Sequence, residues 1–294
     1  MSTRADKQTP TGGVLYVVAM PIGNPDDISA RAIRILAEVN VIACEDTRRT
    51  GSMLASHGIC TPTLSYYEHN EERRTPQLIE RLAAGEKIAL VTDAGTPAIS
   101  DPGFRLVRAA LEAGVRVAAV PGASAVIAAL SIAGLATNRF AFEGFLPPRD
   151  GPRRKLLDSL RREPRTMVFY EAARRLADTL GEMASAFGGT RIAAVVREIT
   201  KTYEETIRGS LDELAHRFRE QPALGEVTIV VAGAPENSTD STIEGTAVTA
   251  EILRDAGLSL KQASAVIARL TGRGRREVYQ AALKSIGKEE PADE

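Results

Sequence analysis

The first half of the chain alternates short apolar runs with segments in which apolar residues recur at helical spacing. The apolar runs are LYVVAM (15–20), VIACE (41–45), KIALVTD (87–93) and VRVAAVP (115–121). The helical segments are 28–39, 75–85 and 104–114, and Thr75 with Pro76 suits the start of the second. Almost continuously apolar strands that alternate with helices are typical of a parallel sheet covered on both faces. The pattern therefore predicts an α/β domain.

The second half repeats this alternation after a helix predicted at 124–134. We expect strands at 140–145, 166–172, 192–199, 204–210 and 226–233, and helices at 153–163, 174–187 and 211–219. The third and fourth of these strands are close enough in sequence to form a hairpin, which indicates a mixed sheet. Ser210 and Glu213 have the spacing of a capping box at the start of the last helix.

A polar segment, APENSTDST (234–242), precedes the C-terminal helical patterns. Three short helices are predicted within TAVTAEILRDAG, LSLKQASAVIARLTG and RREVYQAALKSIG. Ser259 with Gln262 suits a second capping box, and Gly257 and Gly272 suit helix ends. We expect three domains: an N-terminal α/β domain at 14–123, a second α/β domain at 124–234, and a small helix-turn-helix-like domain at 243–287.

Composition narrows the class of protein. The 294 residues include 37 Lys and Arg against 38 Asp and Glu, so the whole molecule does not attract nucleic acid, although local patches can. No apolar run approaches the length of a membrane span, and the first residues lack the apolar stretch of a signal peptide. Cys44 and Cys60 have no metal-ligand spacing and fit a reducing compartment. We expect a soluble, cytoplasmic protein with no bound metal.

Candidate chemistry gathers in loops that follow the predicted strands. These loops are MPIGNPDD (20–27), CEDTRR (44–49), TDAGTPAISDPG (92–103) and VPGASAV (120–126). Open α/β sheets bind ligands outside the carboxyl ends of their strands, and Gly and Pro bring backbone close to a ligand in a fixed shape. Dinucleotide, P-loop, zinc-hydrolase and nucleophile-elbow motifs are absent. The residues alone predict a small-ligand site at a domain junction, with purely structural turns as the alternative.

In order along the chain, LYVVAMPIGNPDDIS, CEDTRRTGSML, SYYEHNE, LVTDAGTPAISDPG, VPGASAV, FEGFLPPR and GEVTIVVAG resemble the ribosomal RNA small subunit methyltransferase I family. That family is a branch of the tetrapyrrole-methylase fold (class III methyltransferases). The resemblance covers about residues 14–233, and the C-terminal helices fit the family's small helical domain. It implies S-adenosylmethionine as methyl donor, bound in a cleft between two α/β domains. It also implies a homodimer whose acceptor is a cytidine ribose 2′-hydroxyl near the decoding centre of 16S rRNA, in free RNA or in the 30S subunit.

The resemblance also implies where the donor binds. Loop 91–103 takes the place of a Gly-Asp-Pro loop of the metabolic relatives, and Thr96 stands where those relatives have Asp. The helix N-terminus at Ala123 and Ser124 suits the donor carboxylate. The expected donor-binding residues are Met20, Pro21, Ile22, Asp93, Ala94, Gly95, Thr96, Pro97, Ile99, Ala123, Ser124, Tyr170 and Thr228.

Methyl transfer to a hydroxyl needs alignment of the reacting atoms and a nearby proton acceptor, but no metal. The candidate acceptors are Glu45, Asp46, His69, Asp93, Glu171 and Glu198. Glu45 and Asp46 are favoured because they follow a strand directly, and His69 because it lies in a polar loop. The alternatives are that the two acids cap the next helix and that His69 is a surface residue.

Basic residues near the same loops are candidates for RNA phosphate contacts. They are Arg48, Arg49, Arg149, Arg174, Arg197 and Lys201, together with segment 152–165, which has six basic and two acidic residues. Segment 243–287 has seven basic and four acidic residues, and its turn TGRGRRE adds Arg273, Arg275 and Arg276. The alternatives are solvated helix faces and a packing or dimer element. Two other functions stay open: methylation of a tetrapyrrole-like metabolite and non-catalytic rRNA binding during ribosome assembly.

Overall fold

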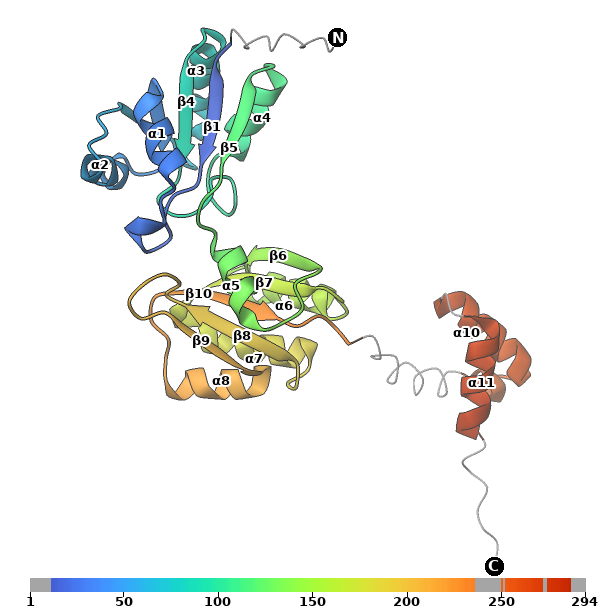
Figure 1. The fold of residues 1–294 in the computed structure, drawn as a ribbon. Helices are drawn as coiled ribbons and strands as arrows, with labels where there is room; N and C mark the ends of the chain where they lie inside the picture. The colour runs from blue at the N-terminus through green and yellow to red at the C-terminus, as the bar shows by residue number, and fades with distance from the viewer. Residues whose placement is uncertain (1–11, 236–249, 251, 272–273, 287–294) are drawn as a thin grey trace, which may run out of the picture. The chain divides into compact units, whose positions relative to one another are not determined.

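The structure is a computed structural model that describes residues 12–235, 250, 252–271 and 274–286 (Figure 1). The chain divides between Gly233 and Ala234 into two compact units, which are described separately. Within the described segments, every helix is too short or too polar to cross a membrane.

The first sheet of the larger unit has five strands, all parallel, in the order β3-β2-β4-β1-β5. Its strands are β1 (Val14–Val18), β2 (Val41–Cys44), β3 (Thr63–Ser65), β4 (Lys87–Val91) and β5 (Arg116–Val120). The elements between them are η1 (Pro25–Asp27), α1 (Ala30–Glu38), α2 (Thr47–Ser56), α3 (Glu71–Ala83) and α4 (Phe104–Glu112). Buried side chains form one cluster with α1 and another with α3 and α4, on opposite faces. The predicted parallel sheet with two covered faces is confirmed.

The second sheet is mixed and has the order β6-β7-β10-β8-β9. Its strands are β6 (Phe140–Phe145), β7 (Thr166–Ala172), β8 (Ile192–Arg197), β9 (Glu205–Ser210) and β10 (Glu226–Val231). One face is covered by α5 (Ala125–Ala133), and the other by α6 (Asp150–Leu160), α7 (Leu176–Phe187) and α8 (Leu211–Glu220), while η2 (Ala173–Arg175) leads into α7 (Figure 1). The β8–β9 hairpin and the Ser210–Glu213 capping box are confirmed.

Several elements differ from the sequence-based prediction, and β3 and α3 show why. Strand β3 was not predicted, because its three half-buried residues form no apolar run at the sheet edge. Helix α3 begins four residues before Thr75, so the predicted start at Thr75 and Pro76 was wrong. The Thr75 hydroxyl donates to the carbonyl oxygen of Glu71 at 2.6 Å, and it lies 3.0 Å from the Tyr66 hydroxyl. A buried hydrogen-bond network, which a local pattern does not show, therefore holds Thr75 inside the helix.

Strand β6 contains an irregularity that gathers three aromatic side chains. Its parallel register with β7 shifts between Phe142 and Gly144, so that one residue of β6 has no partner. Tyr170 therefore contacts both Phe142, at 4.9 Å between ring centroids, and Phe145, at 5.4 Å.

The smaller unit contains α10 (Leu260–Thr271) and α11 (Arg275–Ile286) around a core that includes Ile267 and Val278. Reciprocal bonds between Ser259 and Gln262 confirm the predicted capping box. In the first predicted C-terminal helix, TAVTAEILRDAG, residues 246–249 and 251 lie outside the described residues, as does Gly272, and the described part is helical at 250 and 252–255.

Candidate functional site

The loops that follow β1 and β4 are joined by backbone hydrogen bonds. The N–H of Met20 donates to the carbonyl oxygen of Gly95 at 2.8 Å, and the N–H of Gly95 donates back to Met20 at 3.1 Å. Gly95 has a φ of 72°, a left-handed conformation that favours glycine. The carboxyl ends of these two strands therefore present one rigid edge, as the sequence analysis expected for a ligand site.

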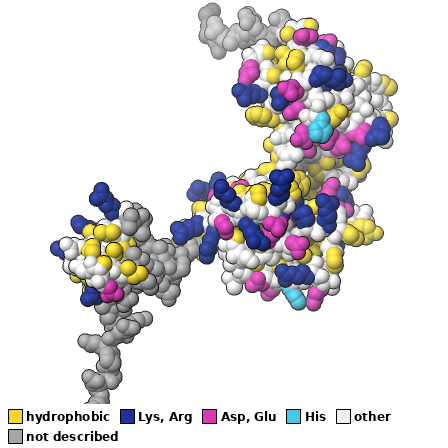
Figure 2. Space-filling view, turned by 180° about the vertical axis from the view of Figure 1, so that it is seen from behind, with side chains coloured by type: hydrophobic (Ala, Val, Ile, Leu, Met, Phe, Trp, Pro, Cys, Tyr) yellow, Lys and Arg dark blue, Asp and Glu magenta, His cyan; other side chains and the backbone are white. Residues whose placement is uncertain are grey.

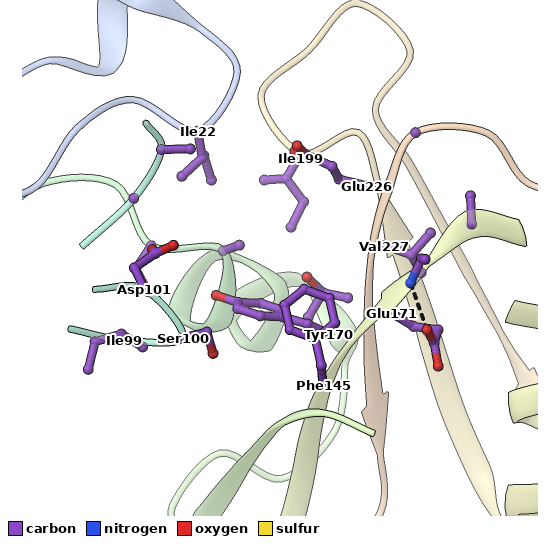
Figure 3. Close-up of a pocket in the computed structure, with 18 of the residues that line it drawn as sticks. Ile22, Ile99, Ser100, Asp101, Phe145, Tyr170, Glu171, Ile199, Glu226 and Val227 are labelled. Atoms are coloured by element: carbon purple, nitrogen blue, oxygen red, sulfur yellow. Dashed lines mark hydrogen bonds between the residues drawn. The ribbon is translucent and has the colours of Figure 1, made fainter. Parts of the chain in front are cut away.

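A cavity of about 580 Å³ lies at this edge, between the loops of the two sheets (Figure 3). Its volume is in the range of small-molecule sites. Eight of the thirteen expected donor-binding residues line it: Ile22, Ala94, Gly95, Thr96, Ile99, Ser124, Tyr170 and Thr228.

The other five expected residues do not line the cavity. Met20 and Pro97 are buried behind it, Pro21 is half-buried, and Asp93 is ion-paired with Arg49. The carbonyl oxygen of Ala123 accepts a hydrogen bond from the Thr96 hydroxyl at 3.5 Å. Met20 and Ala123 thus hold the wall-forming residues Gly95 and Thr96 in place.

Twelve further residues line the cavity: Ser100, Asp101, Ala125, Phe145, Glu171, Ala172, Ala173, Arg174, Ile199, Gly225, Glu226 and Val227. Most of them lie in loops or strand ends of the second sheet, and two of them, Glu171 and Arg174, were candidates for other roles. Ser100 and Asp101 lie inside the quoted motif TDAGTPAISDPG, so their position in that loop was the available signal.

Helix α5 begins at the cavity without a side-chain cap. Its N-cap residue, Ser124, makes no capping hydrogen bond, and both Ser124 and Ala125 line the cavity. The first N–H groups of a helix lack intrahelical partners and carry partial positive charge. This end of the cavity is therefore suited to a carboxylate or phosphate.

Two isoleucines of the cavity wall are held between strained residues. Ala98 and Ser100 flank Ile99, and Glu198 and Thr200 flank Ile199. These four are the non-glycine residues of the described chain with positive φ, from 51° to 69°. Such conformations cost about 1–3 kcal/mol each and cluster at functional sites. In both loops, strained residues therefore hold an isoleucine at the cavity wall.

The three favoured catalytic candidates lie outside the cavity wall. Asp46 is the N-cap of α2: its carboxylate accepts the Arg48 N–H at 2.8 Å, and its hydrogen bond with the Arg48 side chain lowers its pKa to about 2. Asp46 therefore caps the helix that follows it, which was the alternative to a catalytic role. Glu45 accepts a long hydrogen bond, 3.5 Å, from the Asp93 N–H. His69 is exposed and contacts the Tyr67 ring edge-on, at 6.2 Å between centroids.

Two other candidate acceptors are engaged in structural bonds. The buried carboxylate of Glu171 accepts from the Thr179 hydroxyl at 2.7 Å and pairs with Arg175 at 3.1 Å. Glu198 pairs with Lys201 at 2.9 Å. Neither carboxylate is free to take a proton without losing these partners.

The candidate RNA-binding residues are spread over the surface of the larger unit. Figure 2 shows Lys and Arg interleaved with Asp and Glu rather than in one continuous patch. Arg149 is exposed at the start of α6, whereas Lys201 is held by Glu198 and Glu226, and Arg197 by Glu205. In the smaller unit Arg275 and Arg276 are exposed, and Arg273 lies outside the described residues.

Comparison with known proteins places the chain in a family. The model of the tetrapyrrole (corrin/porphyrin) methylases matches residues 14–215, and that of the RsmI C-terminal HTH domain matches residues 240–285. Ribosomal RNA small subunit methyltransferase I of Pseudomonas aeruginosa is 48% identical over 285 residues, which are 95% of this chain and 99% of the relative. The Xylella fastidiosa (strain Temecula1) protein of the same name is 47% identical over 271 residues, 92% of this chain and 98% of the relative. The chain belongs to the ribosomal RNA small subunit methyltransferase I family.

Membership confirms the resemblance inferred from the loop motifs, and solved structures confirm the fold class of the family. Cobalt precorrin-4 methyltransferase aligns with a TM-score of 0.56 at 19% identity, over 75% of this chain and 94% of that one. Uroporphyrin-III C-methyltransferase of Thermus thermophilus, complexed with S-adenyl homocysteine, aligns with a TM-score of 0.53 at 23% identity. The alignment covers 74% of this chain and 97% of that one. At these identities the likeness shows the fold alone.

Proposed function

We propose that the protein transfers a methyl group from S-adenosylmethionine to the ribose 2′-hydroxyl of a cytidine in 16S rRNA, near the decoding centre. Membership of the ribosomal RNA small subunit methyltransferase I family supports the reaction and the class of substrate. The structural observation that carries the proposal is the cavity in which the Gly95 loop, the uncapped start of α5 and an apolar wall meet.

The residues of the cavity fit the proposed donor. The N–H groups at Ser124 and Ala125 suit its carboxylate, and the backbone around Gly95 suits its polar groups. Ile22, Ile99 and Ile199 supply apolar surface for the adenosine (Figure 3). When bound, the donor supplies a methyl group on a positively charged sulfur.

The remaining expectations follow from this activity. We propose that 14–123 and 124–234 are the two α/β domains that form the donor site, and that the helical domain at 243–287 contacts the RNA. We further propose that Arg48, Arg149, Arg275 and Arg276 bind phosphates, because their side chains are exposed. A protein that modifies ribosomal RNA acts where ribosomes are assembled, so we expect it in the cytoplasm. We also propose that the protein is a homodimer.

The direct test incubates the purified protein with methyl-labelled S-adenosylmethionine and ribosomal acceptors that lack the modification. Naked 16S rRNA and assembled 30S subunits are compared, followed by digestion to nucleosides and mass spectrometry. The expected result is 2′-O-methylcytidine in at least one of the two acceptors. Donor binding without any labelled nucleoside would favour an rRNA-binding assembly factor, and transfer to a tetrapyrrole in place of RNA would favour a metabolic enzyme.

A further inference from the structure

Asp101 is a carboxylate of the donor cavity that has no partner in the described chain. Three carboxylates line the cavity, and two of them are bonded: Glu171 to Thr179 and Glu226 to Lys201. Asp101 makes no hydrogen bond or ion pair with any described residue, although it is half-buried. A half-buried polar group without a protein partner is a candidate for contact with a ligand.

The surroundings of Asp101 raise the pKa of its carboxyl group. Burial, followed by the negative charges of Glu45 and Asp93, raises the pKa of Asp101 to about 6. The phenol of Tyr170 lies across the cavity with its hydroxyl towards Asp101 (Figure 3), and burial and the Asp101 charge raise the Tyr170 pKa. The cation of the cavity wall is Arg174, whose side chain is exposed. A group with a pKa near 6 is ionised at neutral pH and is still basic enough to accept a proton.

Asp101 lies where two cavities share a wall. Besides the donor cavity, there is a second cavity of about 780 Å³, whose lining includes Ser100, Asp101 and Phe104 together with the charged residues Glu68, Glu71, Arg105, Arg108 and Glu112. Phe104 is 68% exposed, so the second cavity offers an aromatic surface to a large ligand. A group on the shared wall is accessible from both sides, as transfer between two bound molecules requires.

The backbone around Asp101 is fixed in this position. Ala98 and Ser100 have left-handed conformations, and the N–H of Ala98 donates to the carbonyl oxygen of Pro102 at 3.3 Å. At Gly103, which has a φ of 134°, an added Cβ would lie 2.8 Å from the Leu90 side chain. The loop is thus strained and closely packed at once, which is expected where a side chain must be held for function.

We propose that Asp101 accepts the proton of the hydroxyl group that is methylated, and that this hydroxyl comes to it from the second cavity. The assignment rests on the function proposed above. As the hydroxyl oxygen gains the methyl group, its proton passes to the Asp101 carboxylate, and the positively charged sulfur becomes a neutral thioether. The assignment differs from the sequence-based preference for Glu45, Asp46 and His69, because those groups are bonded elsewhere or lie outside the cavity wall.

The test compares the wild type with Asp101→Asn, which keeps the shape and removes the charge, and with Asp101→Glu, which keeps the carboxylate. Glu220→Gln, an exposed change on α8, is the control for loss of one negative charge. Single-turnover methylation at saturating donor is measured from pH 5 to 8 with the acceptor identified above. We expect the methylation rate of Asp101→Asn to be about 10²–10⁴-fold lower than that of the wild type. The rise in rate around pH 6 that the wild type shows should be absent from this variant. Asp101→Glu should recover part of the rate, and Glu220→Gln should match the wild type.

Calorimetry supplies a measurement that needs no turnover. An ionised Asp101 near the reacting centre favours the positively charged S-adenosylmethionine over the neutral S-adenosylhomocysteine. The ratio of their affinities should therefore rise several-fold from pH 5 to pH 8 in the wild type and in Glu220→Gln, and stay constant in Asp101→Asn.

Each outcome decides a separate point. A rate within threefold of wild type in folded Asp101→Asn, or a pH-dependent affinity ratio that persists in it, overturns the assignment of Asp101. If the wild type binds the donor but methylates no ribosomal acceptor, the proposed function fails. In that case the calorimetry still tests Asp101. A ratio of donor to S-adenosylhomocysteine affinity that does not change with pH in the wild type counts against Asp101. A ratio that changes with pH in the wild type and not in Asp101→Asn supports the place of Asp101 beside the reacting centre.

Discussion

Arg49 of helix α2 and Asp93 of the loop after β4 form an ion pair, with 3.1 Å between Nη1 and Oδ2. The other carboxylate oxygen of Asp93 accepts the N–H of Asp46 at 3.2 Å. Asp93 therefore ties the loop beside the cavity to the start of α2. This relationship separates two arginines that the sequence analysis treated alike.

Arg48 and Arg49 should respond differently to replacement by alanine. Arg48 is 91% exposed, and its side-chain partner among the described residues is its neighbour Asp46, so its guanidinium is accessible to a phosphate. Arg48→Ala should weaken RNA binding and lower the slope of log affinity against log salt by about one contact. Arg49→Ala should leave that slope nearly unchanged and cost at most about 1 kcal/mol of stability, since its pair is surface-exposed. Filter binding across a salt series checks both, and equal slopes in the two variants would refute the distinction.

Gly95→Val should abolish donor binding without unfolding the protein. At a φ of 72° any L side chain is strained by about 1–2 kcal/mol, and the added Cβ would lie 3.5 Å from the Ile22 side chain in the cavity wall. Gly58→Val is a matched control, because Gly58 has a φ of 68° and open space around it. Both variants should lose similar stability in urea, and only Gly95→Val should lose donor affinity, by more than tenfold. Equal affinities in calorimetry would show that the loop does not hold the donor.

Asp101→Asn should stabilise the protein at neutral pH. Because the folded-state pKa of Asp101 is about 6 against 3.8 for the free group, the folded protein retains a proton that the unfolded chain releases. Stability should thus fall as pH rises from 3.8 to 6 and stay lower above it. Asp101→Asn has no carboxylate to ionise, so it does not lose this stability. Its free energy of unfolding should exceed that of the wild type by about 1–2 kcal/mol at pH 8, after allowance for solvent screening, and should equal it at pH 3.5. Urea unfolding at both pH values measures it, and a gain of the same size at pH 3.5 would argue for a packing effect instead.

A chain that ends at Ala234 should keep donor affinity and lose methylation of the ribosomal acceptor. The division between the two units falls at this point, and the residues lining the donor cavity all precede it. Calorimetry with S-adenosylmethionine and the methylation assay are run side by side on the shortened and full chains. Loss of donor binding on shortening would show that the C-terminal segment supports the core.

Much of the fold was predictable because its signals are local. Four of the five strands of the first sheet are apolar runs, and both capping boxes need residues only three positions apart. Strand β3 was missed because it is a short edge strand, and the start of α3 because Thr75 bonds to Tyr66 outside the helix.

The site was predictable as loops but not as individual roles. The sequence presents Glu45, Asp46, Asp93 and Asp101 as similar acids beside strand ends. What distinguishes them is the partner that each one has: Arg48 for Asp46, Arg49 for Asp93, and none among the described residues for Asp101. Folding brings Arg49 to Asp93 from 44 residues away, which leaves no trace in local spacing, so the unpaired acid appears only in the structure.

The irregularity in β6 decides on which face of the sheet the cavity residue Phe145 lies. Side chains alternate between the faces of a sheet, so Phe142 and Phe145, three positions apart, would face opposite sides of a regular strand. The extra residue between Phe142 and Gly144 restores the parity and brings both rings onto Tyr170. A strand of the same length without this irregularity would turn Phe145 towards the helices on the other face, although no side chain of the cavity had been changed. The position of the Phe145 ring therefore depends on the backbone path of β6 as well as on its residues.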